Sequence, residues 1–407
     1  MTNRFSHATV TAASAALMLL ATSTVSAAQA STGPAAGHAA PAWSGCAVDK
    51  AARGTLYVAN AGPTPGTVTP IPVCTDVAGK PIPVGNAPGT MAITPNGKTV
   101  YVVNENSGTV TPIRTATNTP GKAIRVGERL DRVVAITPDG KTVYVASSSS
   151  RGAVEFVAPI STATNTLGKP IPVGQSPEAI AITPDGKTAY VVSSVGVVTP
   201  IHTATNTAGP GIPVGGGATA YAIAITPNGR TAYVVSEGAN TVTPINTCTN
   251  KPGKPIPVGQ APIAIAITPN GRTAYVANLD SDTVTPINTR TDKPGKAIQV
   301  ARRPVAIAIT PNGKTAYVAN VGTGFASSVI PIRTATNRAG KPIRVGDIPE
   351  AIVITKDGKT AYVLNFGAAS GAPEGSVTPI STATNTAARE IIVGVNPIAI
   401  AITPPAR

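Results

Sequence analysis

The chain has 407 residues, including 40 glycines and 40 prolines, and only 12% of its residues are charged. The formal net charge is +14, aromatic residues make up 3%, and there are three His and three Cys. The share of Gly and Pro is below that of aperiodic disordered chains. The few His and Cys exclude a His-rich metal centre and a disulfide-dense scaffold.

Residues 1–30 have the pattern of a secretory signal peptide. They carry one formal charge, at Arg4, then an apolar stretch densest at 15–20, and Ala28-Gln29-Ala30 offers a cleavage site. A short membrane anchor is the alternative, although the apolar stretch is shorter than a bilayer requires. Residues 31–50 are rich in Ala, Gly and Pro and predict a flexible linker. We expect a secreted or envelope-associated protein without a transmembrane segment after signal removal.

One sequence unit recurs along residues 51–407. Its most regular member is a tyrosine, repeated at intervals of 42 to 46 residues. The tyrosines are Tyr57, Tyr101, Tyr144, Tyr190, Tyr233, Tyr275, Tyr317 and Tyr362. A period of this length is typical of solenoids, propellers and other arrays.

The content of one period predicts a propeller blade. Around Tyr275, the segment 263–267 is apolar throughout and suits a strand buried on both faces. After a Pro-Asn-Gly turn, 273–277 predicts a second strand, 283–287 a third and 296–300 a fourth. Four short strands with turns between them describe a blade of an all-β propeller.

The two ends of the repeat array predict a closed ring. The first copy lacks the apolar first strand, and a lone copy of that strand stands at 398–402. If it pairs beside 55–60, the C-terminal strand completes the N-terminal blade and eight four-stranded blades close. Seven blades are the alternative, with the first unit packed outside the ring.

The repeat resembles that of the YVTN-family β-propellers. The match is Thr-Pro-Asn/Asp-Gly-Lys/Arg-Thr-Ala/Val-Tyr-Val, as at 94–102 and 310–318, and the repeats cover 55–403. The resemblance implies that the apolar strand lines the central channel. Related propellers include surface-layer and adhesive modules, lactonase-like hydrolases and exported proteins without a known role. One departure is a proline inside each third strand. Because proline cannot donate to a ladder, we expect its ring nitrogen to face the outermost strand, which should pair weakly.

Charge is predicted to separate between the two faces of such a ring. Turns 1–2 and 3–4 of every blade share one face, here called the bottom, and the other loops share the top. The bottom collects 21 Lys and Arg against five Asp. Its most regular members are Lys98, Lys141, Lys187, Arg230, Arg272, Lys314 and Lys359. A basic face could attract anionic polymer, although solvation of exposed turns is a sufficient explanation for Lys beside Gly.

Catalytic groups are scarce. Outside the signal peptide the only histidines are His38 and His202, and the latter is expected on a bottom turn, so a Ser-His-Asp triad has no histidine. We expect no catalytic residue, no metal site and no cofactor. The missing aromatic residues also argue against nucleic acid.

One position of the repeat varies in chemical type. The residue just before each first strand should rim the top mouth, and the polar or charged members of this ring are the candidate ligand-binding residues. They are Arg132, Glu178, Tyr221 and Glu350, where other blades have Gly, Ile or Val. Sites of propellers occur at such rims, and drift among exposed positions is the alternative. A salt bridge from Arg132 to Glu178, one blade away, would neutralise one acid.

The three cysteines are unevenly placed. Cys46 and Cys74 flank the second strand of the first unit, and we predict a disulfide between them. Cys248 lies four units from Cys74, which is too far for a disulfide bond. We therefore expect Cys248 to remain outside any disulfide within the chain.

These patterns favour an exported, monomeric, non-enzymatic propeller that serves as a rigid interaction or cell-surface binding module. Its expected partner is an anionic cell-wall polymer or another exported protein. The alternative is a lactonase-like hydrolase, or a binder of a small ligand or ion, that uses the top mouth.

Overall fold

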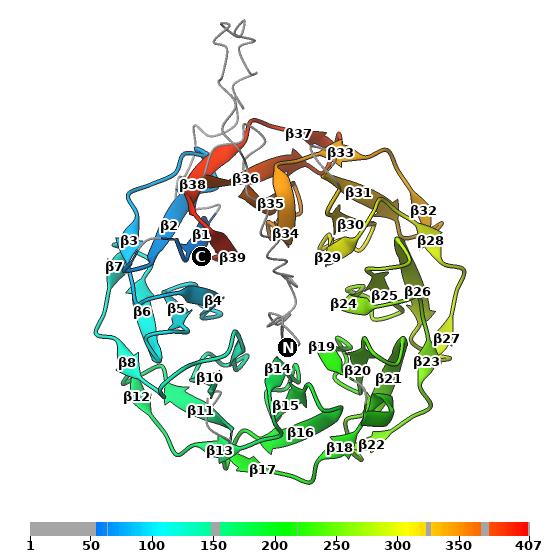
Figure 1. Cartoon of the computed structure of the whole chain (residues 1–407), viewed down its shortest axis with the longest axis horizontal. Coiled ribbons are helices and arrows are strands. Elements are labelled where there is room, and N and C mark those ends of the chain that lie inside the picture. Colours follow the sequence, from blue (N-terminus) through cyan, green and yellow to red (C-terminus); the bar gives the residue numbers. More distant parts are fainter. Residues whose placement is uncertain are drawn as a thin grey trace, which may run out of the picture.

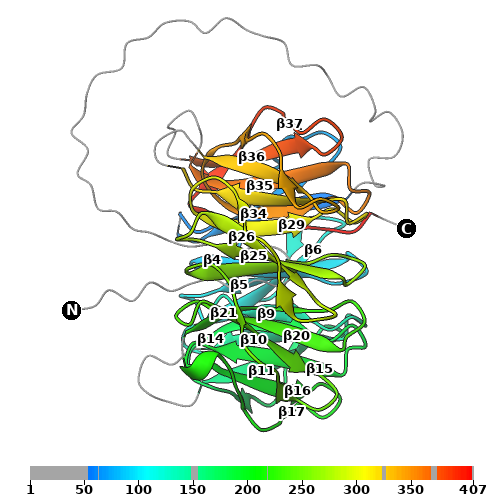
Figure 2. The same cartoon turned by 90° about the vertical axis from the view of Figure 1, so that its right-hand side faces the viewer.

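The computed structural model describes residues 54–62, 64–147, 155–217, 219–322, 327–367 and 374–405. Eight β-sheets are arranged around a central axis (Figure 1), and their strands run roughly parallel to that axis (Figure 2). The helical element of the described part is the 3₁₀ turn η1, Gly215–Gly217. No helix in these ranges is long and apolar enough to cross a membrane. The predicted signal peptide and linker, residues 1–50, lie outside the described residues.

Each blade has four antiparallel strand positions, counted from the axis outward. The inner strands of blades 1 to 8 are β39 (Pro397–Ile402), β4 (Pro88–Ile93), β9 (Val134–Ile136), β14 (Pro177–Ile182), β19 (Ala220–Ile225), β24 (Pro262–Ile267), β29 (Pro304–Ile309) and β34 (Asp347–Ile354). The second strands, in the same order, are β1 (Thr55–Asn60), β5 (Thr99–Asn104), β10 (Thr142–Ser147), β15 (Thr188–Ser193), β20 (Thr231–Ser236), β25 (Thr273–Asn278), β30 (Thr315–Asn320) and β35 (Thr360–Gly367).

The third strands are β2 (Thr67–Pro72), β6 (Thr109–Arg114), β11 (Phe156–Ser161), β16 (Val197–His202), β21 (Thr241–Asn246), β26 (Thr283–Asn288), β31 (Ser328–Arg333) and β36 (Glu374–Ser381). The outer strands are β3 (Ile82–Pro83), β7 (Thr119–Pro120) with β8 (Ile124–Arg125), β12 (Thr166–Leu167) with β13 (Ile171–Pro172), β17 (Thr207–Ala208) with β18 (Ile212–Pro213), β22 (Lys251–Pro252) with β23 (Ile256–Pro257), β27 (Lys293–Pro294) with β28 (Ile298–Gln299), β32 (Arg338–Ala339) with β33 (Ile343–Arg344), and β37 (Thr386–Ala387) with β38 (Ile391–Val395).

The ring closes as the sequence predicts. The C-terminal β39 pairs antiparallel with β1, with Leu56 opposite Ile402 and Val58 opposite Ile400. This sheet has the order β3-β2-β1-β39, so the first blade takes its inner strand from the other end of the chain. The eight-bladed prediction is confirmed, and the seven-bladed alternative is wrong.

The hydrophobic core lies between successive blades. Inner strands alternate Ile or Val with Ala, and these side chains pack against the Tyr-Val strands of the next blade. Every repeat tyrosine is buried, and its hydroxyl donates at 2.6–2.7 Å to an Asn or Asp Oδ1 in turn 3–4 of the following blade. The last of these bonds, Tyr362 to Asp76, joins blade 8 to blade 1. All eight Asn or Asp acceptors have positive φ, which these two residue types tolerate best after glycine.

The prolines of the third strands interrupt the outer strands. In blade 6 the carbonyl of Pro286 accepts a hydrogen bond of 2.7 Å from the Gly295 N–H of the outer segment. The proline nitrogen therefore faces the same way, and no ladder bond can form there. The outer segment pairs only in two short pieces, β27 and β28, one on each side of the proline. The expected orientation of the proline and the weak outer pairing are both confirmed.

Candidate functional site

The bottom turns place one cation per repeat in the same local structure. In blade 2 the Thr94 hydroxyl donates to Asn96 Oδ1 at 2.7 Å, and the Lys98 N–H donates to the same oxygen at 3.0 Å. Gly97 has φ +69°, which favours glycine at this corner of the turn. The backbone of Lys98 is therefore fixed while its side chain extends into solvent.

Seven blades repeat this arrangement, and all seven predicted cations are exposed. They are Lys98, Lys141, Lys187, Arg230, Arg272, Lys314 and Lys359. Turn 3–4 of each blade lies beside turn 1–2, as shown by the Thr115 hydroxyl donating to the Gly97 carbonyl at 2.7 Å. The two kinds of basic turn therefore share one face.

The side chain two positions before each cation divides this ring electrostatically. It is Asp in blades 3, 4 and 8, and Asn in blades 2, 5, 6 and 7. Lys141 lies 3.8 Å from Asp139, and Lys187 lies 3.7 Å from Asp185. The Thr137 hydroxyl, followed by the Lys141 N–H and charge, holds the pKa of Asp139 below its usual value, so this acid is ionised at neutral pH. Blades 5 to 7 consequently form the longest run of cations without an acid in their own turns.

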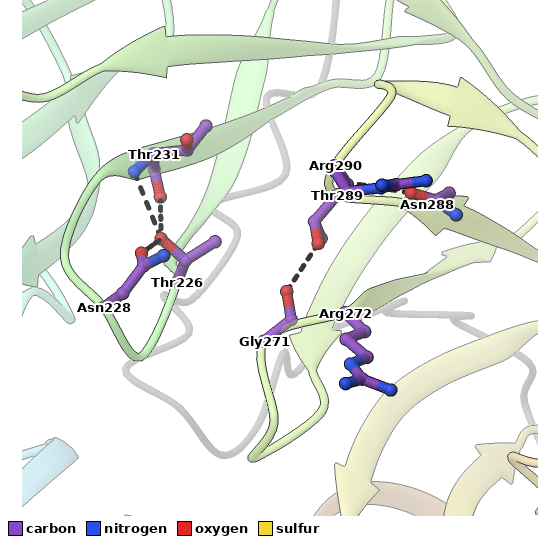
Figure 3. Close-up of a pocket in the computed structure, with 8 residues that line it drawn as sticks. All are labelled: Thr226, Asn228, Thr231, Gly271, Arg272, Asn288, Thr289 and Arg290. Carbon is purple, nitrogen blue, oxygen red and sulfur yellow. Dashed lines mark hydrogen bonds between the residues drawn. The ribbon is translucent and has the colours of Figure 1, made fainter.

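A pocket opens within this run, between blades 5 and 6 (Figure 3). Its volume is about 510 Å³. It is lined by Thr226, Asn228, Thr231, Gly271, Arg272, Asn288, Thr289 and Arg290. The Thr289 hydroxyl donates to the Gly271 carbonyl at 2.5 Å, and the Arg290 N–H donates to Asn288 Oδ1 at 3.0 Å, which fixes the wall from blade 6. On the blade 5 side, the Thr226 hydroxyl donates to Asn228 Oδ1 at 2.7 Å. Two arginines and no acid line the pocket, so its chemistry suits a small anionic group.

Three of the four candidate residues of the top mouth, Glu178, Tyr221 and Glu350, occupy β-bulges, whereas Arg132 precedes its inner strand β9. In blade 4 the β14–β15 ladder shifts by one residue between Pro177 and Ala179, and Glu178 is the extra residue. Glu350 holds the same place in β34. Glu178, Tyr221 and Glu350 were expected just before the strand and are found within it, at its second or, in β34, its fourth position, while Arg132 lies before β9 as expected. A bulge re-aims a side chain and is frequent beside functional sites.

Arg132 is held by a buried ion pair that the sequence analysis does not predict. Its Nε lies 2.6 Å from Oε1 of Glu105, and both side chains are largely shielded from solvent. Arg132 thus pairs with Glu105 of blade 2 and not with Glu178. Gly89 makes room for this pair, because a Cβ there would lie 1.7 Å from Glu105 Oε1. Glu105 follows the second strand, where blade 5 has Glu237 and blades 6 and 7 have Leu279 and Val321. The sequence therefore marks a variable position but does not single out Glu105.

The other three candidates are half-buried or buried. Burial, with the charges of Asp131 and Glu155, raises the pKa of Glu178 to about 8. Burial also raises the pKa of Glu350 to about 8, against the opposing charge of Arg132. Tyr221 bonds to Glu237, and burial together with that carboxylate and Glu178 raises its pKa. At the mouth, therefore, the charge of Arg132 favours the ionised form of Glu350, and the charge of Glu178 disfavours ionisation of Tyr221.

Below the mouth the channel is apolar. All eight inner strands line a cavity of about 730 Å³, and its walls are Ile, Val, Ala, Met and Pro. Among the described residues no group of three His, Cys, Asp or Glu side chains is placed to hold a metal ion. Cys248 is an exposed free cysteine. Cys46 lies outside the described residues, so its disulfide with Cys74 stays a prediction.

No protein-family model matches the chain, and no curated protein matches it. Solved structures are similar in fold. Dihydro-heme d1 dehydrogenase NirN, in complex with DHE, aligns with a TM-score of 0.72 at 16% identity, over 87% of this chain and 75% of its own. Hydrazine synthase of Kuenenia stuttgartiensis aligns with a TM-score of 0.56 at 21% identity, over 73% and 96%. A functionally unknown protein from Desulfotomaculum acetoxidans DSM 771 gives 0.57 at 17% identity, over 86% and 99%. At these identities the likeness is one of fold, and the chain is an eight-bladed β-propeller with enzymes among its structural neighbours.

Proposed function

We propose that the chain is an exported propeller of the YVTN-repeat kind that acts by binding rather than by catalysis. In this proposal the bottom face docks on an anionic polymer of the cell envelope. The observation that carries it is the run of Arg230, Arg272 and Lys314 on consecutive blades, none with an acid in its own turn.

Electrostatics favours this sector over the rest of the ring. Arg230, Arg272 and Lys314 are exposed at equivalent places on neighbouring blades, so successive charges of an extended polymer can meet them together. The pocket beside Arg272 and Arg290 supplies a recess for one anionic group. In blades 3 and 4 the neighbouring Asp cancels much of the attraction that Lys141 or Lys187 exerts on an approaching anion. Such interactions weaken with salt, because the Debye length is only about 8 Å at physiological ionic strength.

Charge reversal in two matched sets of three tests the proposal. Set one is Arg230→Glu, Arg272→Glu and Lys314→Glu, and set two is Lys141→Glu, Lys187→Glu and Lys359→Glu. Both remove six units of positive charge. Binding to immobilised poly(glycerol phosphate) is measured by biolayer interferometry at low and physiological salt. At about 0.5 kcal/mol for each exposed contact, set one should weaken binding roughly tenfold and flatten its salt dependence.

Set two should change log Kd for the polymer by less than half as much as set one, because an Asp in the same turn already screens each of its cations. Equal losses from both sets would show that net charge, and not this sector, attracts the polymer. Absence of binding by the unchanged protein at low salt would refute the proposal itself.

A small-ligand role for the top mouth is the second candidate. The observation in its favour is Glu350, a carboxyl that is only 4% exposed and sits at a bulge on the channel rim.

A further inference from the structure

The central cavity opens toward the basic bottom face. Every strand residue in its wall comes from the last three positions of an inner strand. All eight inner strands end on a partly exposed isoleucine, such as Ile182, Ile225 and Ile267, and these residues form an isoleucine ring in the wall. In six blades the proline of turn 1–2 also lines the cavity. These six prolines are exposed to solvent, so the cavity reaches the surface among the bottom turns.

The wall of this cavity is chemically uniform. It consists of Ile, Val, Ala, Met and Pro, with no aromatic ring to stack on a planar ligand and no polar side chain to form a hydrogen bond. A polar group buried there would lose its hydrogen bonds to water without replacement, which is costly. A hydrocarbon chain has no such need, and the volume of about 730 Å³ lies within the usual range of ligand sites, about 300–1,000 Å³. Any polar group of a ligand must therefore lie at the bottom opening.

One residue at the bottom opening departs from the repeat. Blades 2 to 7 have a proline directly before the Asn-Gly or Asp-Gly corner of turn 1–2, whereas blade 8 has Lys356. The blade 8 turn keeps the geometry of the others, since the Thr355 hydroxyl and the Lys359 N–H donate to Asp357 Oδ1 at 2.6 and 3.0 Å. The backbone of Lys356 therefore occupies the place at which the six prolines line the cavity. The residue is exposed, so this one blade adds an ammonium group to an otherwise apolar rim.

Charge favours an anion at this opening. The exposed Lys359 belongs to the same turn as Lys356, and the other bottom turns supply one regular cation per blade from blade 2 to blade 7. Asp357 is the acid next to Lys356 in the sequence, and its Oδ1 is already bound within the turn. Glu178 and Glu350 belong to the opposite ends of their strands. An anionic head group at the bottom opening therefore meets cations and is kept apart from the acids of the top mouth.

We propose that the cavity binds a long-chain fatty acid, with its alkyl chain against the isoleucine ring and its carboxylate at Lys356. The lysine ammonium group has three donors and suits a carboxylate as a compact point charge. This site is separate from the sector of Arg230, Arg272 and Lys314 that is proposed to bind the polymer, so either proposal can fail while the other holds.

Isothermal titration calorimetry of the full chain tests the site with three probes below their micelle-forming concentrations: decanoate, butyrate and decyltrimethylammonium. Decanoate should bind at least tenfold more tightly than butyrate, because more methylene groups leave water, and more tightly than decyltrimethylammonium, which has the opposite charge. Lys356→Pro gives blade 8 the residue of blades 2 to 7 and should weaken decanoate binding about tenfold. Lys341→Gln removes an exposed cation between β32 and β33, in the outer part of blade 7, and is the matched control that should leave decanoate binding unchanged.

A second measurement needs no variant. Titrations at several temperatures should show a negative heat-capacity change when decanoate binds the unchanged protein, because its alkyl chain becomes buried. Attraction of the carboxylate to surface cations alone would not give this change. Equal affinity for decanoate and butyrate, tighter binding of decyltrimethylammonium, unchanged decanoate binding by Lys356→Pro, or the absence of a heat-capacity change would each overturn the proposal.

Discussion

At the scale of single residues, the burial of Glu350 makes the free energy of unfolding depend on pH. Its pKa is about 8 in the folded protein, where burial disfavours the charge, against an ordinary value near 4.5. Between these two values the unfolded chain has lost the proton while the folded chain keeps it. Stability is therefore greatest below the unfolded pKa and falls as pH rises toward 8.

Glu350→Gln removes the contribution of Glu350 to this dependence, because glutamine does not titrate and matches the neutral acid in shape; the contribution of Glu178, whose pKa is also raised to about 8, remains. We expect the variant to melt near the same temperature as the unchanged protein at pH 4.5 and at a clearly higher temperature at pH 8. Differential scanning fluorimetry across this range measures the difference, with Glu128→Gln as the control. A gap between the two proteins that does not widen with pH would contradict the burial of an uncharged Glu350.

At the scale of elements, the tyrosine bonds fasten each blade to the next. The Tyr144 hydroxyl of blade 3 donates at 2.6 Å to Oδ1 of Asn206 in blade 4, and Asn206 has φ +53°. Tyr144→Phe and Asn206→Gly each lose one hydrogen bond and should cost about 1 kcal/mol. Asn206→Ala also forces a Cβ into the left-handed region, which adds about 1–2 kcal/mol.

Urea denaturation of the three variants measures these losses. The double variant Tyr144→Phe/Asn206→Gly should cost less than the sum of its two single changes, because both remove the same bond. Additive losses would show that the contact contributes nothing of its own.

The blade could be predicted from the sequence because its local signals agree. Strand 263–267 is apolar, turn 268–272 contains Asn-Gly, and both recur at a fixed period that random drift does not produce. The Glu105–Arg132 pair could not be predicted, because it depends on a loop that differs in every blade and on the space that Gly89 leaves. The bulges could not be predicted either, since an extra residue in a short apolar strand leaves no mark on its composition.

At the scale of the whole molecule, the ring depends on one strand from the far end of the chain. Deletion of residues 396–407 removes β39, which pairs with β1 and packs against β34 and β4. The buried Ile398 and Ile400 would be lost, at about 1.5–3 kcal/mol for each apolar side chain. We expect the truncated protein to melt at a much lower temperature and to associate through the uncovered edge.

Scanning calorimetry and size-exclusion chromatography test this expectation. Addition of a synthetic peptide covering 396–407 should restore part of the lost stability, since the same strand can enter from a separate molecule. An unchanged melting temperature after the deletion would mean that β39 does not hold the ring together.

The pairing of β1 with β39 also sets the order of events during synthesis. The hydroxyl of Thr403 accepts a hydrogen bond from the N–H of Thr55, 348 positions earlier in the chain. At about 5–20 residues per second, a ribosome needs roughly 20–70 s to make the intervening segment. During that time seven blades can assemble in turn while the inner edge of β1 waits uncovered. The first blade to leave the ribosome is therefore the last one to be finished.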